Sequence, residues 1–147
     1  MMKILLCSFL TAVCLFVGTY SAGTDSSSSS NLVSITYTVW VYSNVSEEFT
    51  LKLNTERHTS FYDVMQQAAQ QDSRYEFEAN KFSWGHYITK LAGHQEIPAE
   101  YTFWMIYKTP RLPDPAHPPS DALLTPVGVD EIQVNDAEHY LFWLKKI

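Results

Sequence analysis

Both cysteines of this 147-residue chain, Cys7 and Cys14, lie inside an almost unbroken apolar run near the N-terminus. The run covers residues 4–17 and follows a single positive charge at Lys3. This pattern is typical of a secretory signal peptide, which is removed from the mature protein. Without the run the chain has no cysteine, so its fold must be held by packing alone, without a disulfide.

The small residues after the run predict where the signal peptide ends. Segment 18–23 offers the side chains beside which a signal peptidase cleaves. We therefore expect a signal peptide at 1–22, cleaved near 21–23, and a secreted, extracellular protein. An uncleaved signal anchor is the alternative, but the run is too short to span a bilayer comfortably. About 125 residues remain after cleavage, enough for one domain with a core but not for two.

The net charge of the chain limits the classes of molecule that it is expected to bind. The chain carries 10 Lys and Arg against 16 Asp and Glu, a net charge of −6, and removal of Lys3 makes it −7. No basic stripe is present that could meet a phosphate backbone, so the sequence argues against nucleic-acid binding. We also expect no membrane association after cleavage.

Low-complexity sequence separates the signal peptide from the folded part. Residues 23–31 include an uninterrupted serine run at 26–30, which has no apolar side chain to bury. We predict a flexible, serine-rich leader at 23–31 and one folded domain at 32–147.

Alternation of apolar and polar residues predicts strands. The clearest strand is 33–42, and segment 49–53 alternates in the same way, so the two are predicted to form a hairpin. Segment 101–107 is apolar on both faces, which is typical of a strand in the middle of a sheet. The later segments that predict strands are 75–78, 86–91, 101–108 and 140–144.

One amphipathic helix follows the predicted hairpin. Thr59 or Ser60 is expected to be its N-cap, and Asp63 lies in its first turn. The residues of its apolar stripe are Phe61, Val64, Met65 and Ala68. A single stripe predicts that the helix lies across a sheet. The order of hairpin, helix and further strands predicts an α+β, β-grasp-like fold, with a mixed sheet and the helix packed on one face.

Two predicted loops have distinctive sequences: one contains a glycosylation sequon and the other is rich in proline. Asn44-Val45-Ser46 in the first hairpin turn is a glycosylation sequon, so we expect a glycoprotein modified at Asn44. The alternative is that Asn44 only makes the turn. The second loop is predicted to be extended, because it contains Pro110, Pro113, Pro115, Pro118 and Pro119.

Catalytic and metal-binding motifs are missing from the sequence. There is no Gly-x-Ser-x-Gly elbow, phosphate-binding glycine loop or paired metal-ligand motif. The histidines are scattered, without the spacing of a helical metal site: His58, His86, His94, His117 and His139. The adjacent acids Asp130-Glu131 and Glu47-Glu48 would point to opposite faces of a strand, so we interpret them as solvated surface. We predict neither an enzyme nor a metal site.

Aromatic residues are the positive signal, because Phe, Trp and Tyr make up 14% of the chain. Large flat side chains suit large flat ligands. Within segment 82–88, Gly85 allows close backbone approach directly after Trp84. The alternative interpretation is a turn of the hydrophobic core with a bulge glycine.

The order of the aromatic segments resembles the C-terminal domain of the transcobalamin and intrinsic factor family. The similarity extends from Leu32 through nearly the whole remaining chain. The segments that carry it are Tyr75-Glu76-Phe77-Glu78, Phe82-Ser83-Trp84-Gly85-His86-Tyr87-Ile88-Thr89, Tyr101-Thr102-Phe103-Trp104, Pro126-Val127-Gly128-Val129 and Tyr140-Leu141-Phe142-Trp143.

This resemblance implies a function. In that family the domain has a β-grasp-like fold and covers one face of cobalamin, while a larger helical barrel covers the other. It implies a protein that binds cobalamin (vitamin B12) or a related corrinoid as a transported ligand rather than as a catalytic cofactor. The implied contact residues are Ser83, Trp84, Gly85, His86, Tyr87, Ile88, Phe103 and Trp104. No barrel sequence is present, so we expect weak binding alone, or a site completed by a separate helical-barrel chain or receptor.

Two residues and one loop depart from the family pattern. Met105 stands where the family often has glutamine, which removes one hydrogen bond to the ligand, and loop 109–125 is longer and richer in proline. His86 replaces an aliphatic residue, and an imidazole can ligate cobalt. The alternative function is a secreted protein-interaction module or protease inhibitor of β-grasp type, which would dock a partner on a sheet edge or on the proline-rich loop.

Overall fold

The computed structural model describes residues 31–147. The predicted signal peptide, and the serine-rich leader apart from Asn31, lie outside the described residues. Within 31–147, no helix is long and apolar enough to cross a membrane.

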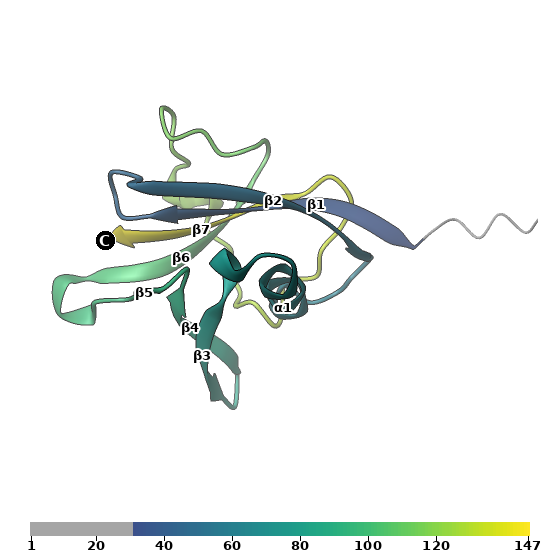
Figure 1. Cartoon of the computed structure of the whole chain (residues 1–147), viewed down its shortest axis with the longest axis horizontal. Helices are drawn as coiled ribbons and strands as arrows, with labels where there is room; N and C mark the ends of the chain where they lie inside the picture. Colours follow the sequence, from purple (N-terminus) through teal and green to yellow (C-terminus); the bar gives the residue numbers. More distant parts are fainter. Residues whose placement is uncertain (1–30) are drawn as a thin grey trace, which may run out of the picture.

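The larger of two sheets has four strands in the order β2-β1-β7-β6 (Figure 1). β1 (Leu32–Val41) and β2 (Glu47–Glu56) form the predicted antiparallel hairpin. β7 (His139–Lys146) lies parallel to β1, and β6 (Thr102–Thr109) lies antiparallel to β7. The sheet is therefore mixed, and its central pair joins the first and the last strand of the described chain.

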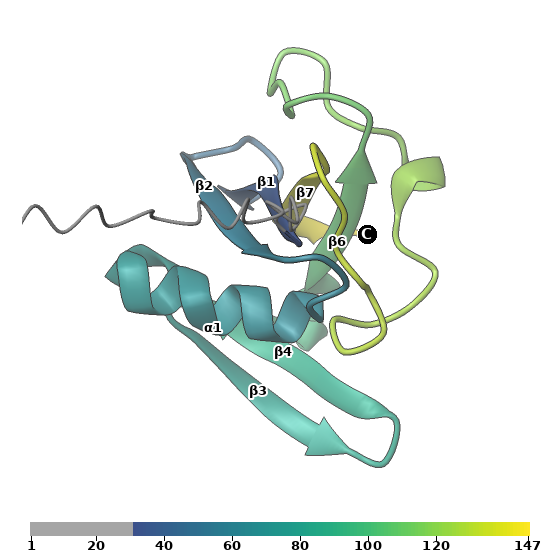
Figure 2. The ribbon, with the colours of Figure 1, turned by 90° about the vertical axis from the view of Figure 1, so that its right-hand side faces the viewer.

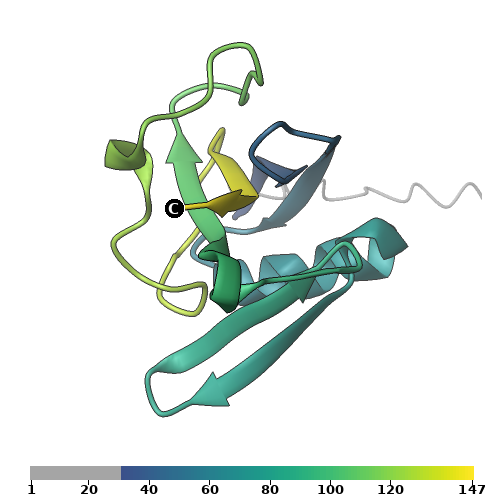
Figure 3. The same ribbon diagram turned by 90° about the vertical axis from the view of Figure 1, so that its left-hand side faces the viewer.

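A smaller sheet has three strands, in the order β3-β4-β5. β3 (Phe77–Phe82) and β4 (Gly85–Leu91) form a hairpin, and β5 (His94–Gln95) pairs with the far end of β4. Figures 2 and 3 show this hairpin below helix α1 (Phe61–Gln71), with its tip pointing away from the larger sheet. The tip carries the segment from which ligand contacts are predicted.

Helix α1 begins where the sequence predicts. Ser60 is the N-cap, and its hydroxyl oxygen accepts a hydrogen bond from the Asp63 backbone N–H at 3.1 Å. The same hydroxyl donates to Asp63 Oδ2 at 2.7 Å, which closes the first turn. The buried residues of the helix are Phe61, Val64, Met65 and Ala68, the four predicted for its apolar stripe. The predicted α+β class, with one helix on a mixed sheet, is confirmed.

Two hydrophobic clusters pack on opposite faces of the larger sheet. The cluster on the helix side includes Tyr37, which packs against Phe61 with ring centroids 5.1 Å apart. The smaller cluster contains Trp40, Tyr107, Leu141 and Trp143, with Leu123 and Leu124 of the loop between β6 and β7 packed against it. The loop therefore covers the sheet face opposite the helix, and a short 3-10 turn, η3 (Asp121–Leu123), lies within it. The other 3-10 turns are η1 (Ser73–Tyr75) and η2 (Pro98–Glu100).

Two strand predictions need correction. Residues 75–78 were predicted to be a strand, but η1 ends at Tyr75 and β3 begins only at Phe77. The cause is tertiary: the Tyr75 ring is buried, and its hydroxyl donates to the Tyr37 carbonyl at 3.0 Å. β6, predicted to be central, lies at a sheet edge. Its two apolar faces arise because the two hydrophobic clusters cover it from opposite sides.

Candidate functional site

Strand alternation divides the predicted segment 83–88 between two faces of the β3–β4 hairpin. Lys81 pairs with His86 and Asn80 with Tyr87, so the side chains of His86 and Tyr87 lie on opposite faces. Ile88 lies on the same face as His86 and is buried in the core. Only part of the predicted segment can therefore contact one ligand face.

Two exposed rings and one partly buried ring form an aromatic surface at the end of the hairpin. Trp84 is 58% exposed and Phe82 is 47% exposed, and their rings stack with centroids 5.1 Å apart and planes 7° apart. Tyr87 meets the Trp84 ring edge-on at 6.4 Å. We call Phe82, Trp84 and Tyr87 the aromatic tip. It offers flat, apolar area of the kind that binds planar ligands.

A hydrogen bond fixes the orientation of Tyr87 in the aromatic tip. Its hydroxyl donates to Glu96 Oε2 at 2.8 Å. Burial of the ring and this acidic partner raise the pKa of Tyr87 to about 12. The phenol therefore stays neutral at physiological pH.

Asp130 holds the base of the aromatic tip against the body of the domain. Its Oδ2 accepts from the His86 backbone N–H at 2.6 Å, and its Oδ1 accepts from His86 Nδ1 at 2.7 Å. The His86 ring also stacks on Tyr62 of α1, with centroids 3.9 Å apart. Gly85 has φ +128°, and a Cβ at that position would lie 2.8 Å from Asp130 Oδ2. We call this carboxylate with its two bonds the Asp130 latch.

The charge state of the latch follows from its hydrogen bonds. Burial alone would raise the pKa of Asp130, but the bonds from the His86 backbone and ring outweigh it and hold that pKa below its usual value. The sequence predicts Asp130 as solvated surface on a strand, and this is wrong, because it lies in a turn and bonds the hairpin. His86 and Asp130 are 44 positions apart, so no local pattern could have linked them.

Phe103 and Trp104, the contact residues predicted on the second strand, lie on β6 and do not form part of the aromatic tip. Trp104 is only 7% exposed, and its indole N–H donates to the His94 carbonyl at 3.0 Å. It belongs to the helix-side core, near Phe142. Phe103 is partly exposed and, as its neighbour on a strand, points to the opposite face of the sheet. Trp84 and Trp104 thus differ: one indole is open to a ligand, and the other belongs to the core.

The remaining predicted positions lie on the surface. Ser83 is exposed in the turn beside Trp84. Asn44 is exposed in the β1–β2 turn, where the Ser46 backbone N–H donates to the Val41 carbonyl at 2.9 Å. Glycosylation of Asn44 stays a prediction.

The histidines are distributed over the domain. His94 Nε2 donates to Glu47 Oε1 at 2.9 Å, and His117 Nδ1 donates to Asp114 Oδ2 at 2.8 Å. Across residues 31–147, no group of three or more His, Cys, Asp or Glu side chains is arranged to hold a metal ion.

A cavity of about 650 Å³ lies between α1 and the base of the β3–β4 hairpin. Polar groups of both elements line it, among them Gln66, Gln70, Glu78 and Lys90. Lys90 Nζ lies 2.8 Å from Glu78 Oε1, so these two charges balance one another. None of the eight predicted contact residues lines this cavity.

The chain is similar to part of a much longer protein. No protein family model matches it. An uncharacterised protein of Drosophila melanogaster is 47% identical over 127 residues, which cover 86% of this chain and 21% of that protein. The chain therefore spans about a fifth of the length of that curated relative.

Two solved structures share the fold. Haptocorrin in complex with Cbi superposes with a TM-score of 0.64 at 19% identity, covering 80% of this chain and 26% of haptocorrin. A candidate metal-binding protein from Ruminococcus gnavus superposes with a TM-score of 0.54 at 15% identity, covering 78% of this chain and 98% of that one. At these identities the comparisons establish the fold alone, so the resemblance to the transcobalamin family is a resemblance of fold.

Proposed function

We propose that this protein is a secreted ligand-binding module that binds a corrinoid, such as cobalamin, on the aromatic tip, and that it is not an enzyme. The observation that carries the proposal is the exposed stack of Phe82 on Trp84, with Tyr87 edge-on beside it. A domain of the same fold occurs in haptocorrin, whose structure contains the corrinoid Cbi. Exposed stacked rings with a fixed base suit a bulky, planar molecule.

Each residue of the proposed site has a separate role. The Phe82 and Trp84 rings contact the edge of the macrocycle, and the Ser83 hydroxyl donates to its amide arms. The Asp130 latch acts indirectly, because it fixes the turn through His86 and does not itself touch the ligand. We leave Trp104 and Ile88 out of the contact set, because both side chains are buried.

The aromatic tip covers one side of a ligand only. It projects from the domain on a two-stranded hairpin, and the chain spans about a quarter of haptocorrin. The other face of the corrinoid would be covered by a helical barrel, from a separate chain or from a longer form of this protein. Alone, the module would bind weakly, since affinity falls with the ligand surface left in water.

The test is a titration of residues 31–147 with cobalamin and with Cbi, monitored by corrin absorbance and tryptophan fluorescence. Saturable binding is expected, and Trp84→Ala should weaken it at least about tenfold, the scale of a lost aromatic anchor. Tyr101→Ala is the matched control, because Tyr101 is also exposed and lies outside the aromatic tip. No spectral change at millimolar ligand would contradict the proposal.

A second function is favoured by one observation on the proline-rich loop. Leu112 is 50% exposed between Pro110 and Pro113, in a segment whose backbone conformation is restricted by proline. Such segments are recognised by grooves that bind extended peptides. Pull-down from secreted fluid with the wild type and with Leu112→Glu distinguishes this function, because corrinoid binding does not involve the loop.

A further inference from the structure

We infer that a second cavity binds a small, neutral and mostly apolar molecule that carries one carbonyl oxygen. This cavity lies between edge strand β6 and the loop that joins β6 to β7, and its volume is about 540 Å³. Pockets for drug-sized ligands have volumes of about 300–1,000 Å³. None of the aromatic-tip residues lines it, so the inference is independent of the proposed corrinoid site.

The walls of the cavity are apolar. They include Leu123, Leu124, Val127 and Ile132. Val127 lines the cavity and is 37% exposed, so it lies where the cavity opens to solvent. Leu123 and Leu124 pack against the smaller hydrophobic cluster, so this wall is fixed to the sheet rather than free in solvent.

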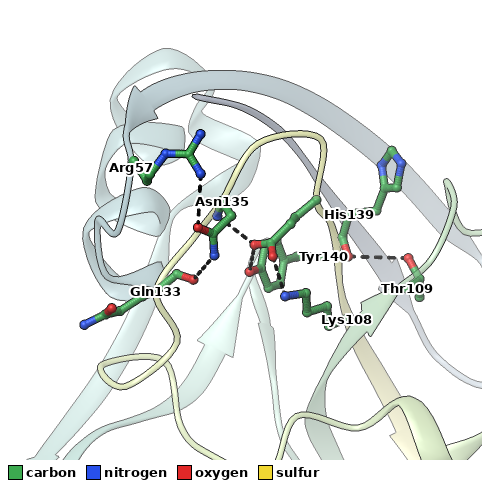
Figure 4. Close-up of polar contacts among 8 residues, drawn as sticks. Arg57, Lys108, Thr109, Gln133, Asn135, His139 and Tyr140 are labelled. Carbon is green, nitrogen blue, oxygen red and sulfur yellow. Dashed lines mark hydrogen bonds and ion pairs between the residues drawn. The ribbon is translucent and has the colours of Figure 1, made fainter. Parts of the chain in front are cut away.

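Polar groups lie at one end of the same cavity, where Lys108 and Tyr140 line it. Both side chains bond the carboxylate of Glu138. Figure 4 shows Lys108 and Tyr140 pointing toward this shared partner. The Tyr140 hydroxyl donates to Glu138 Oε2 at 2.5 Å, and the Asn135 backbone N–H donates to the same oxygen at 2.8 Å. Lys108 Nζ forms an ion pair with Glu138 Oε1. Glu138 therefore holds the polar end in place.

These contacts determine which ligand group the polar end prefers. Burial and Glu138 raise the pKa of Tyr140, so its phenol stays protonated and its hydroxyl continues to donate its hydrogen bond to the Glu138 carboxylate. An ammonium has three N–H groups, and Lys108 uses only part of that capacity on Glu138. The free donors of Lys108 can bind an oxygen acceptor on a ligand.

The acceptor should be neutral. The charge of Lys108 is already balanced by Glu138, so a ligand carboxylate would lose its hydration without gaining an unpaired cation. A ketone or ester oxygen can accept the same hydrogen bond at a much smaller desolvation cost. Apolar walls with one neutral polar contact thus define the ligand class.

The experiment titrates ¹⁵N-labelled residues 31–147 with 2-decanone and, separately, with decanoate. Saturable amide shifts are expected for 2-decanone at Lys108, Thr109 and Val127 and at positions 122–125 and 132–133. Decanoate should bind at least about tenfold more weakly, because its charge is not compensated. Equal affinity for the two probes, or no shifts with 2-decanone, would overturn the inference.

Two variants with the same change test the location. Val127→Glu places a charge at the open side of the cavity and should weaken 2-decanone binding at least about tenfold. Leu112 lies in the same loop, is also exposed and does not line the cavity. The Leu112→Glu variant should therefore bind 2-decanone like the wild type. Equal weakening by both variants would refute the site. Trp84→Ala should leave 2-decanone binding unchanged, which keeps this test separate from that of the corrinoid site.

Discussion

At the scale of single residues, two tryptophans of the predicted site should behave in opposite ways. Trp104→Ala removes a buried indole and should lower the free energy of unfolding by about 3–5 kcal/mol. Trp84→Ala removes an exposed ring and should change it by no more than about 0.5 kcal/mol. Urea denaturation of both variants measures the difference. Similar losses would show that the Trp84 ring is part of the core.

Two glycines with positive φ provide a matched pair for testing the Asp130 latch, because only Gly85 lies beside it. Gly85→Ala combines backbone strain at φ +128° with a Cβ only 2.8 Å from Asp130 Oδ2. Gly93→Ala has φ +78° and nothing within 4 Å of its Cβ, so it should cost only the strain of about 1–2 kcal/mol. We expect Gly85→Ala to be the more destabilising in chemical denaturation. If adding Asp130→Ala to Gly85→Ala does not recover part of the lost stability, the steric explanation is wrong.

The pH dependence of stability should contain a contribution from Glu138. Burial would raise its pKa, but hydrogen bonds from Lys108, Tyr140 and the Asn135 backbone outweigh this and hold the pKa below the usual 4.5. A carboxyl with a lowered folded-state pKa adds stability above its unfolded pKa, and this is lost as pH falls through the folded value. Wild type should therefore lose stability below about pH 4.5 more steeply than Glu138→Gln. Thermal melts between pH 3 and 6 compare the two, and parallel curves would contradict the assignment.

Residue roles could be predicted from the sequence only where they depend on local pattern. The Ser60 cap and the exposed aromatic turn at Trp84 are of this kind. The roles of Asp130 and Glu138 were not predictable, because Asp130 bonds His86 and Glu138 pairs with Lys108, and both of these partners are distant in the sequence. Alternation also shows that Phe103 and Trp104 face opposite ways, yet it cannot say which of the two faces is buried.

At the scale of elements, the β3–β4 hairpin should be the least stable part of the described fold. β3 pairs with β4 alone, and most of its side chains are exposed. β1 is paired on both sides and is largely buried. Amides of β3 should therefore exchange with solvent faster than those of β1 and β7. Hydrogen exchange measured by mass spectrometry tests this, and Asp130→Ala should accelerate exchange in β4 selectively.

The elements themselves were largely predictable, and their neighbours were not. Periodicity predicted α1 and the β1–β2 hairpin closely, because each buries one continuous face. The same periodicity predicted that β6 lies in the centre of the sheet, but β6 is an edge strand. Because the helix-side core covers one of its faces and the β6–β7 loop covers the other, β6 is apolar on both faces, like a central strand. The second sheet was not predicted either, because the pairing of short strands depends on the whole fold.

At the scale of the whole molecule, the parallel pairing of β1 with β7 should make folding depend on the last strand. A chain that ends at Glu138 lacks β7, and β1 and β6 then lose their shared partner. We expect this variant to show no cooperative unfolding transition by circular dichroism. A chain that ends at Lys146 is the control, because it lacks only the exposed Ile147. A cooperative transition in the shorter variant would contradict the dependence.

The same pairing has a consequence for biosynthesis. Thr36 of β1 and its partner His139 of β7 are separated by 103 positions. During translation β1 therefore cannot pair with β7 until about 103 further residues have been synthesised. At about 5–20 residues per second, the delay is roughly 5–20 s. During this interval one edge of an apolar strand is open to misassembly, so chaperones should bind the growing polypeptide early and release it only after β7 has emerged.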